Sequence, residues 1–326
     1  MFNALVLNQE EQRTLATIEQ IDESQLPSGD VLIAVDYSSL NYKDGLAITG
    51  KGKIIRNFPM VPGIDLAGTV IESQNERYQA GDKVVLTGWG VGENHWGGMA
   101  QRARLQADWL VPLPQGLDSK KAMMIGTAGF TAMLCVQTLL DGGVKPDAGE
   151  VLVTGASGGV GSVAVTLLTQ LGYQVAALTG RVEQNGPLLE KLGASRIIDR
   201  TEFEQPSRPL EKQVWAGAID TVGSKVLAKV LAQMDYNGVV AACGLAGGFD
   251  LPTTVMPFIL RNVRLQGVDS VMCPTDKRIA AWEKLVALLP ESYFEQACTE
   301  VELAQAPSYA EAITNGQVTG RVVIKL

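Results

Sequence analysis

The order of hydrophobic and polar positions divides the chain into a β-rich first part and a second part in which strands and helices alternate. Up to about residue 120, short β-prone runs are separated by turn sequences, such as those at residues 27–30 and 80–82. No long helical pattern interrupts these runs. They predict strands at residues 4–7, 31–35, 69–71 and 83–86.

Apolar residues at helical spacing begin near Ser119. Asp118 or Ser119 is placed to cap a helix over residues 120–125, which ends at a step of small residues starting with Gly126. A second helix is expected over residues 130–140.

From residue 150 the pattern becomes strand, helix, strand, helix. Residues 151–154 form an apolar run without alternation, which is typical of a strand buried on both faces, and residues 160–171 are apolar at helical spacing. The pattern continues with strands at 174–178, 196–198, 216–220, 239–243 and 265–268, and with helices at 188–192 and 225–234. This alternation predicts a parallel sheet that is covered by helices.

The end of the chain returns to the β-rich part. A helix is expected over residues 277–289, and residues 320–326 read as a strand that needs a sheet to join. The β-rich first part is its natural host. The predicted fold class is therefore α/β: a doubly wound Rossmann domain with a parallel sheet, residues 121–269, is inserted in a discontinuous β-rich domain of residues 1–120 and 270–326.

Composition and charge limit the partners of the chain. Its 326 residues carry a net charge of −8 and no basic run, so nucleic acid and anionic membranes are poor partners. The first residues lack the regions of a signal peptide, and no window has the roughly 18 apolar residues of a membrane span. Four cysteines without a CxxC pair are typical of a reducing compartment. We expect a soluble, cytoplasmic protein.

A glycine-rich loop follows the first strand of the alternating part and opens the next helix. Gly155, Gly158 and Gly161 fall at every third residue, with a further glycine at position 159. In a strand–loop–helix unit this pattern is typical of a dinucleotide site, because glycine lets the backbone approach the pyrophosphate and the helix N-terminus offers N–H groups. The alternative is a tight turn without a ligand.

The residues after the second strand of this part distinguish NAD from NADP. An NAD site usually carries Asp or Glu there, whereas this strand ends in Thr179, Gly180 and Arg181. A guanidinium matches the geometry of a 2′-phosphate, and Arg200, after the third strand, can add a second contact. NADPH is therefore the expected cofactor. The alternative for either arginine is a solvated surface position.

His95 is the only histidine of the chain. Zinc dehydrogenases of similar length use a Cys/His/Cys catalytic site and often a four-cysteine structural site. The cysteines at positions 135, 243, 273 and 298 are too scattered to build either site with His95, so we expect no zinc. His95 lies in a glycine-rich loop and either faces a cleft or has no chemical role.

Several segments resemble the zinc-free, quinone-oxidoreductase-like branch of the medium-chain dehydrogenase/reductase superfamily. Residues 40–44 match the Asn-Tyr/Phe-x-Asp segment of that branch. Residues 62–68 match the Gly-His-Glu-x-x-Gly segment of the superfamily, with Ile64 in place of the zinc-binding histidine. The resemblance implies a GroES-like catalytic domain and a Rossmann NADPH-binding domain.

Longer identities, at residues 39–44, 50–56, 88–98 and 253–261, resemble the bacterial YhdH/AcuI subgroup. That subgroup is associated with NADPH-dependent reduction of acryloyl-CoA to propanoyl-CoA, so the resemblance implies an acyl-CoA substrate. Carried over by position, it places cofactor contacts at Tyr42, Ser157, Gly158, Gly159, Val160, Thr179, Gly180, Arg181, Arg200, Leu245, Ile259, Ser270 and Asn315.

Asn41 and Tyr42 are the candidate catalytic residues, because they follow an N-terminal strand where the substrate cleft is expected. In the expected mechanism a hydride from NADPH adds to the β-carbon, and charge builds on the thioester oxygen, which needs positioned donors. Tyr42 can donate a hydrogen bond or relay a proton; the alternative is a ring that stacks on the nicotinamide. Asp44 and Thr127 are further candidates.

Two other functions fit the same sequence features. An NADPH:quinone or general enone reductase would share the fold and the cofactor, and a non-catalytic NADPH-binding protein is the alternative of another class. Members of the superfamily commonly pair through the edge strand of the nucleotide domain. A homodimer through residues 263–268 is therefore expected.

Overall fold

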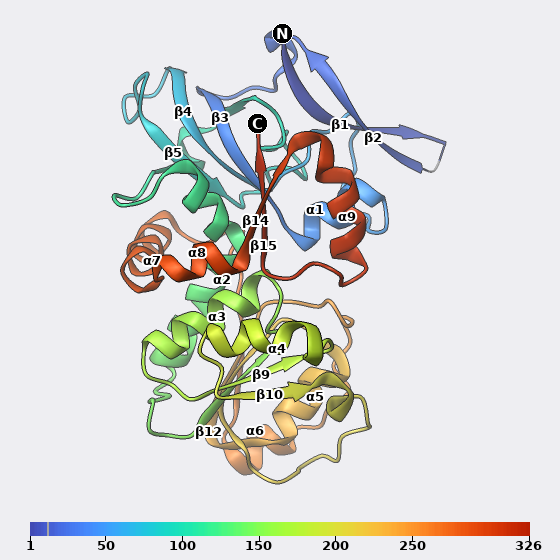
Figure 1. Ribbon diagram of the computed structural model, residues 1–326, viewed down its shortest axis with the longest axis vertical. Helices are drawn as coiled ribbons and strands as arrows, with labels where there is room; N and C mark the ends of the chain where they lie inside the picture. The colour runs from blue at the N-terminus through green and yellow to red at the C-terminus, as the bar shows by residue number, and fades with distance from the viewer. Residues whose placement is uncertain (12) are drawn as a thin grey trace. The chain divides into compact units, whose positions relative to one another are not determined.

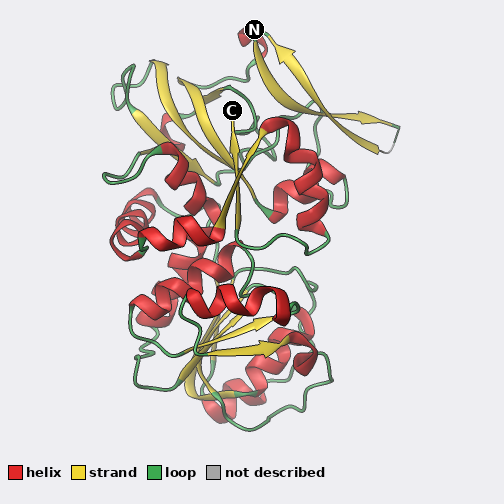
Figure 2. Cartoon of the chain, in the orientation of Figure 1, coloured by secondary structure: helices red, strands yellow, loops and turns green. Residues whose placement is uncertain are grey.

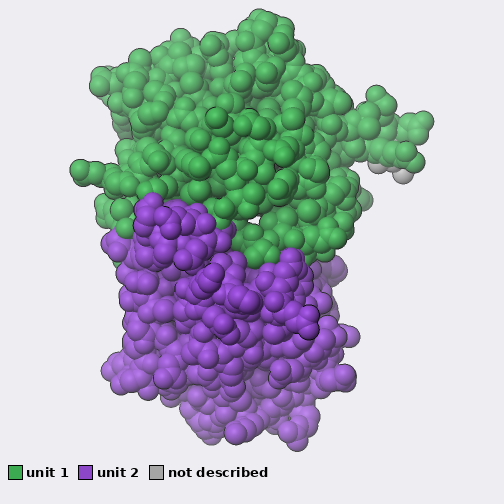
Figure 3. All heavy atoms as spheres, viewed as in Figure 1, with its two compact units in different colours: residues 1–127, 270–286, 298–326 green, residues 128–269, 287–297 purple. Residues whose placement is uncertain are grey.

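The computed structural model describes residues 1–11 and 13–326, which form two compact units (Figure 3). Unit 1 contains residues 1–127, 270–286 and 298–326, and unit 2 contains residues 128–269 and 287–297. The first boundary lies seven residues beyond the expected 120, and residues 287–297 belong to unit 2 although the β-rich domain was expected to include them. Each unit is described by itself.

Unit 2 is built on a parallel sheet, as the alternation of strands and helices predicts (Figure 2). The strand order is β10-β9-β8-β11-β12-β13, and every neighbouring pair is parallel. The chain order therefore reverses between β8 and β11, which is where ligands bind in sheets of this kind. The strands are β8 (Glu150–Thr154), β9 (Val175–Thr179), β10 (Arg196–Asp199), β11 (Trp215–Asp220), β12 (Met234–Ala242) and β13 (Arg264–Gly267).

Helices connect these strands and bury their side chains. Leu152 of β8 and Leu178 of β9 belong to one core cluster with Val230 and Leu231, which explains the apolar run without alternation. The helices that lie wholly within unit 2 are α3 (Gly159–Gln170), α4 (Val182–Lys191), α5 (Ser224–Ala232), α6 (Met256–Arg261) and α8 (Glu291–Ala297). The sequence places the start of α4 six residues too late, because polar residues fill its first turns, and it does not predict α6 or α8.

Unit 1 contains a mainly antiparallel sheet of strand order β14-β15-β3-β4-β5-β7, with β6 also paired to β3. Strand β15 (Arg321–Lys325) pairs antiparallel with β3 (Val31–Leu40), with Val322 opposite Leu40 (Figure 1). The terminal strand thus joins the N-terminal sheet, as predicted. The other strands are β4 (Asp65–Ser73), β5 (Lys83–Thr87), β6 (Arg102–Leu105), β7 (Val111–Pro112) and β14 (Cys298–Glu302), while β1 (Phe2–Glu10) and β2 (Arg13–Ile21) form a separate hairpin.

Two helices of unit 1, α1 (Tyr42–Thr49) and α9 (Ala306–Thr314), pack closely against each other. A Cβ atom added at Gly45 of α1 would lie 2.6 Å from Ile313 Cγ2 of α9, so any larger residue would have to displace this side chain. The sequence predicts neither helix, because each is short. Helix α7 (Thr275–Leu288) is predicted. The 3₁₀ helices of unit 1 are η1 (Glu23–Gln25), η2 (Ala107–Trp109) and η4 (Leu303–Gln305), and η3 (Arg200–Phe203) belongs to unit 2.

Helix α2 (Ser119–Asp141) contains the break that the small residues predict. Gly126 has φ 52° and ψ −160°, so the helix consists of two pieces that meet at this residue. Within the described residues, α2 is also the helix long and apolar enough to cross a membrane. Because 72% of its apolar window is buried inside the protein, this is weak evidence for a membrane span.

Candidate functional site

The glycine loop lies between β8 and α3, in the predicted strand–loop–helix unit. Gly155 has φ +58°, a conformation that favours glycine. A Cβ atom at Gly161 would lie 2.3 Å from the carbonyl oxygen of Gly155, so α3 begins closer to the loop than any other residue allows. The N–H groups of the first turn of α3 have no partner within the helix. The loop therefore has the shape and the donors that a pyrophosphate requires.

Side chains from the carboxyl ends of β8, β9 and β10 meet beside this loop. The hydroxyl oxygens of Ser157 and Thr179 are 3.1 Å apart, and the N–H of Arg181 lies 3.4 Å from the Thr179 hydroxyl. A Cβ atom at Gly180 would lie 3.1 Å from the Arg200 guanidinium carbon. The backbone of residues 179–181 thus lies beside the Arg200 side chain, whereas the Arg181 guanidinium donates to the side-chain oxygen of Gln184 at 3.3 Å. Arg200 is half-exposed and pairs with Glu204 at 3.5 Å.

A buried carboxylate below the loop was not predicted. Asp220, at the end of β11, accepts hydrogen bonds from the Thr154 hydroxyl at 2.7 Å and from the N–H of Gly223 at 2.8 Å. Thr221 also bonds to Thr154, through both its N–H and its hydroxyl. Burial raises the pKa of Asp220, although these donors oppose the shift. The network ties β8 to β11 at the point where the strand order reverses.

The remaining predicted contacts of unit 2 lie on its surface. Leu245 follows β12 and is 60% exposed, and Ile259 of α6 is 72% exposed. Val160 and Gly159 lie in the first turn of α3.

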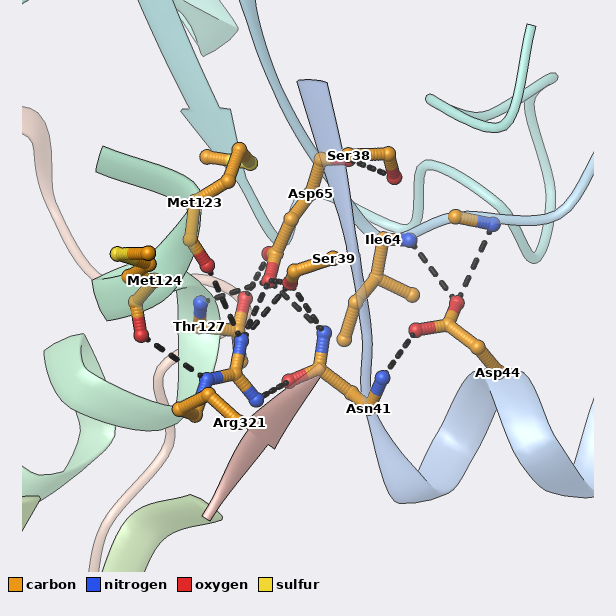
Figure 4. Close-up of polar contacts among 11 residues, drawn as sticks. Ser38, Ser39, Asn41, Asp44, Ile64, Asp65, Met123, Met124, Thr127 and Arg321 are labelled. Atoms are coloured by element: carbon orange, nitrogen blue, oxygen red, sulfur yellow. Dashed lines mark hydrogen bonds and ion pairs between the residues drawn. The ribbon is translucent and has the colours of Figure 1, made fainter. Parts of the chain in front are cut away.

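In unit 1, Asn41 and Tyr42 directly follow strand β3, as the sequence predicts. Asn41 is the N-cap of α1, and Tyr42 is the first residue of this helix. The Asn41 side chain is buried: its oxygen accepts from Arg321 at 3.1 Å, and its nitrogen donates to Asp65 at 2.8 Å (Figure 4). Tyr42 is 38% exposed, and its hydroxyl has no hydrogen-bond partner among the residues that the structure describes. Of the two candidate catalytic residues, Tyr42 therefore has the available donor.

Asp65 and Arg321 form the centre of a buried polar network (Figure 4). Asp65 accepts from Ser39 at 2.6 Å and from the N–H and hydroxyl of Thr127. Arg321 donates to Ser39 at 2.8 Å and to the carbonyl oxygen of Met124 at 3.1 Å. The sequence does not predict this network, because its members are far apart along the chain.

Asp44, in the first turn of α1, is a further buried carboxylate of unit 1, beside Asp65. It accepts from the N–H groups of Asn41 at 2.9 Å, Gly63 at 3.2 Å and Ile64 at 3.0 Å (Figure 4). Burial, together with the negative charge of Asp65, raises the pKa of Asp44 to about 7, and the hydrogen bonds from Asn41 and Ile64 oppose the shift. The carboxylate thereby links the start of α1 to the segment before β4.

The other two predicted contacts of unit 1 are Ser270 and Asn315. Asn315 is exposed at the end of α9, and its side-chain oxygen accepts from the Lys51 ammonium at 3.2 Å. Lys51 also pairs with Glu311 at 2.7 Å. The carbonyl oxygen of Ser270 accepts from Arg278 at 3.2 Å.

His95 packs within unit 1. Its Nδ1 atom lies 3.0 Å from the carbonyl oxygen of Trp96, and its ring meets Trp109 edge-on at 5.2 Å. Across residues 1–11 and 13–326, no group of three or more His, Cys, Asp or Glu side chains is placed to hold a metal ion. Ile64, at the position of the family's zinc-binding histidine, is buried and has no ligand atom in its side chain.

Two family models match the chain. Residues 27–115 match the alcohol dehydrogenase GroES-like domain, and residues 159–290 match the zinc-binding dehydrogenase model. The first match lies within unit 1, and the second covers most of unit 2.

Proteins of known name match the chain over its full length. It is 67% identical to the probable acrylyl-CoA reductase AcuI of Escherichia coli and 54% identical to the acrylyl-CoA reductase AcuI of Ruegeria pomeroyi, with 99% of each protein covered in both cases. It is 44% identical to the putative quinone oxidoreductase YhfP of Bacillus subtilis, over 100% of this chain and 99% of that protein. The crystal structure of the yhdH oxidoreductase from Salmonella enterica, in complex with NADP, superposes with a TM-score of 0.98 at 67% identity and 99% coverage of both chains.

Proposed function

The chain belongs to the medium-chain dehydrogenase/reductase superfamily, in its quinone-oxidoreductase-like branch, and we propose that it is an NADPH-dependent acryloyl-CoA reductase. The reaction reduces the C=C bond of acryloyl-CoA and forms propanoyl-CoA. The full-length identity to proteins named acrylyl-CoA reductase is the observation that carries this proposal.

The chemistry of unit 2 fits NADPH. Gly155 and Gly161 allow a close approach of loop and helix that a Cβ atom would prevent, and the first turn of α3 offers donors for the pyrophosphate. At the end of β9, where an NAD site carries an acid, Thr179 and Arg181 offer a hydroxyl and a cation instead. The proposed cofactor residues of this unit are Ser157, Gly158, Gly159, Val160, Thr179, Gly180, Arg181, Arg200, Leu245 and Ile259, and those of unit 1 are Tyr42, Ser270 and Asn315.

When bound, NADPH supplies the hydride that the β-carbon of the thioester accepts. The residues of the chain bind the cofactor, orient the substrate and donate a hydrogen bond to it. We assign to the Tyr42 hydroxyl the hydrogen bond to the thioester oxygen, where negative charge develops. The Asn41 amide is occupied by Arg321 and Asp65, so we assign to it the support of this turn rather than a contact with the substrate.

We also propose that the protein is cytoplasmic and that it works as a homodimer. In the strand order of unit 2, β13 is an edge strand, and large apolar side chains of the same unit are exposed: Phe249 is 92% and Val255 is 63% exposed. A second copy that pairs through residues 263–268 would cover such a surface. Size-exclusion chromatography with light scattering tests this, and the mass of one chain at micromolar concentration would rule it out.

A quinone or general enone reductase is the second candidate, because the chain is also similar to a putative quinone oxidoreductase. A non-catalytic NADPH-binding protein is the third. The three functions are separated by absorbance at 340 nm with NADPH and, in parallel, acryloyl-CoA, an enone and a quinone. The proposal expects kcat/KM for acryloyl-CoA to exceed that for the quinone and enone by at least about 100-fold, which is the discrimination that pocket shape alone can achieve. NADPH binding without oxidation by any acceptor would favour the third function.

A further inference from the structure

The two neighbours Asn41 and Tyr42 differ in what their side chains can do. The amide of Asn41 both accepts and donates within the buried network, with Arg321 and Asp65 as partners. The Tyr42 side chain is 38% exposed, and its hydroxyl has no partner among the described residues. If the reaction needs one positioned hydrogen-bond donor, that donor is the Tyr42 hydroxyl, and the rate depends on where this first residue of α1 is held.

Asp44 holds that residue through the backbone. One of its oxygens, Oδ2, accepts from the N–H of Asn41, which is the residue directly before Tyr42. The other, Oδ1, accepts from the N–H groups of Gly63 and Ile64, just before β4. Asp44 is 1% exposed, so water does not compete for these bonds. The first turn of α1 is thus fixed to a second, distant backbone segment.

Neither oxygen of Asp44 is available to a substrate. Both are engaged with backbone N–H groups, and the whole side chain is buried (Figure 4). A proton-transfer role would require contact with the reacting atoms. The position of the carboxylate is suited instead to setting the position of its neighbours.

We infer that Asp44 is a positioning residue for Tyr42: its carboxylate fixes the first turn of α1, so that the Tyr42 hydroxyl is held where the thioester oxygen develops charge. This inference rests on the proposed function, since it needs a reaction that uses the Tyr42 hydroxyl. The Asp44 side chain then affects the rate of reduction only through the position of Tyr42.

A double-mutant cycle tests this dependence. kcat and both KM values are measured for the wild type, Asp44→Asn, Tyr42→Phe and the double variant, with NADPH and acryloyl-CoA. Tyr42→Phe is expected to lower kcat by about 100-fold, as the loss of one positioned donor does. Asp44→Asn is expected to lower kcat about 10-fold or more with Tyr42 present, because a small displacement of a donor is costly. In the Tyr42→Phe background the same change is expected to matter less than about twofold, since the donor that it positions is absent.

An equal loss from Asp44→Asn in both backgrounds would overturn the inference, because a general weakening of unit 1 does not depend on the Tyr42 hydroxyl. Lys43→Met is the matched control: it removes the pair that Lys43 of α1 makes with Glu93 at 3.0 Å and leaves the Asp44 bonds intact. This variant should keep kcat within about twofold of the wild type. If Asp44→Asn does not fold, the cycle is repeated with Asp44→Ser, which keeps one acceptor. If neither variant folds, Asp44 serves stability alone and the inference is wrong.

The failure of the proposed function gives a different result. A wild-type chain that does not reduce acryloyl-CoA rejects the proposed substrate, whatever Asp44 does. The cycle is then measured with the enone or quinone that the wild type reduces, where a loss confined to the Tyr42 background still supports positioning and an additive loss still overturns it.

Discussion

The Oδ2 atom of Asp65 lies 3.9 Å from Nη2 of Arg321, and Ser39 joins the two charges by donating to Asp65 and accepting from Arg321. Both charged side chains are almost fully buried, at 0% and 2% exposure. Gly126 lies directly against them, since a Cβ atom there would be 2.6 Å from each of the same two atoms. The break in α2 therefore lies at the residue where a side chain would collide with the ion pair.

Removal of one charge of this pair is expected to destabilise the protein. Asp65→Asn leaves the Arg321 guanidinium buried without its counter-charge, and we expect a loss of about 3–5 kcal/mol in the free energy of unfolding. Asp108→Asn is the control, because the Asp108–Arg77 pair is exposed and should contribute less than about 1 kcal/mol. Urea denaturation followed by circular dichroism measures both. A similar small loss in the two variants would contradict the role of Asp65.

Arg181→Ala tests the assignment of the 2′-phosphate. The loss of a charge-assisted hydrogen bond of about 1.5–3 kcal/mol should weaken NADPH binding by about 10- to 100-fold. NADH lacks the 2′-phosphate, so its affinity should stay within about twofold. Arg208→Ala removes a surface arginine of the same unit and should change neither affinity. Isothermal titration calorimetry gives the dissociation constants, and an equal change for both nucleotides would show that Arg181 does not distinguish them.

Gly161→Ala tests whether the close start of α3 is needed for the cofactor. The added methyl group would meet the Gly155 carbonyl oxygen at 2.3 Å, so the loop and the helix must move apart. We expect a loss of about 1–3 kcal/mol in stability and at least about 10-fold weaker NADPH binding. Gly186→Ala in α4 is the control, because an added Cβ meets no described atom within 4 Å and alanine favours a helix by roughly 0.5–1 kcal/mol. Unchanged NADPH affinity in Gly161→Ala would contradict the phosphate assignment.

The raised pKa of Asp44 predicts how stability depends on pH. With a folded-state pKa of about 7 against 3.8 for the solvent-exposed group of the unfolded chain, the folded protein binds more protons between these values, so stability falls as the pH rises through this range. The difference amounts to about 4 kcal/mol at 1.36 kcal/mol per pKa unit. Asp44→Asn cannot titrate at this site. The unfolding free energy of the wild type, relative to this variant, should therefore decrease between pH 4 and pH 8, and a difference independent of pH would refute the shift.

Much of the fold can be predicted from the sequence, because its periodic patterns are long. The apolar strand at residues 151–154, the helix after it and the terminal strand all lie where the pattern places them. The glycine loop and Thr179 are found because they lie at the carboxyl ends of neighbouring strands of one parallel sheet, and the ends of such strands meet at one edge.

The buried polar networks could not be predicted in this way. Asp65 and Arg321 come together because β15 returns to pair with β3, a pairing that no local pattern specifies. The Asp44 carboxylate lies in a recognisable segment, but its three partners depend on how the backbone before β4 approaches α1. The short helices α1 and α9 are missed because eight or nine residues give too few turns for a helical period to stand out.

The most direct test of the proposed reaction is the fate of the transferred hydrogen. Acryloyl-CoA is incubated with the wild-type chain and NADPH that carries deuterium at the reactive C4 position, and the product is analysed by mass spectrometry and NMR. The proposal predicts propanoyl-CoA with one deuterium at its β-carbon and a solvent-derived proton at its α-carbon. Unchanged acryloyl-CoA, or propanoyl-CoA with its deuterium at the α-carbon, would contradict it.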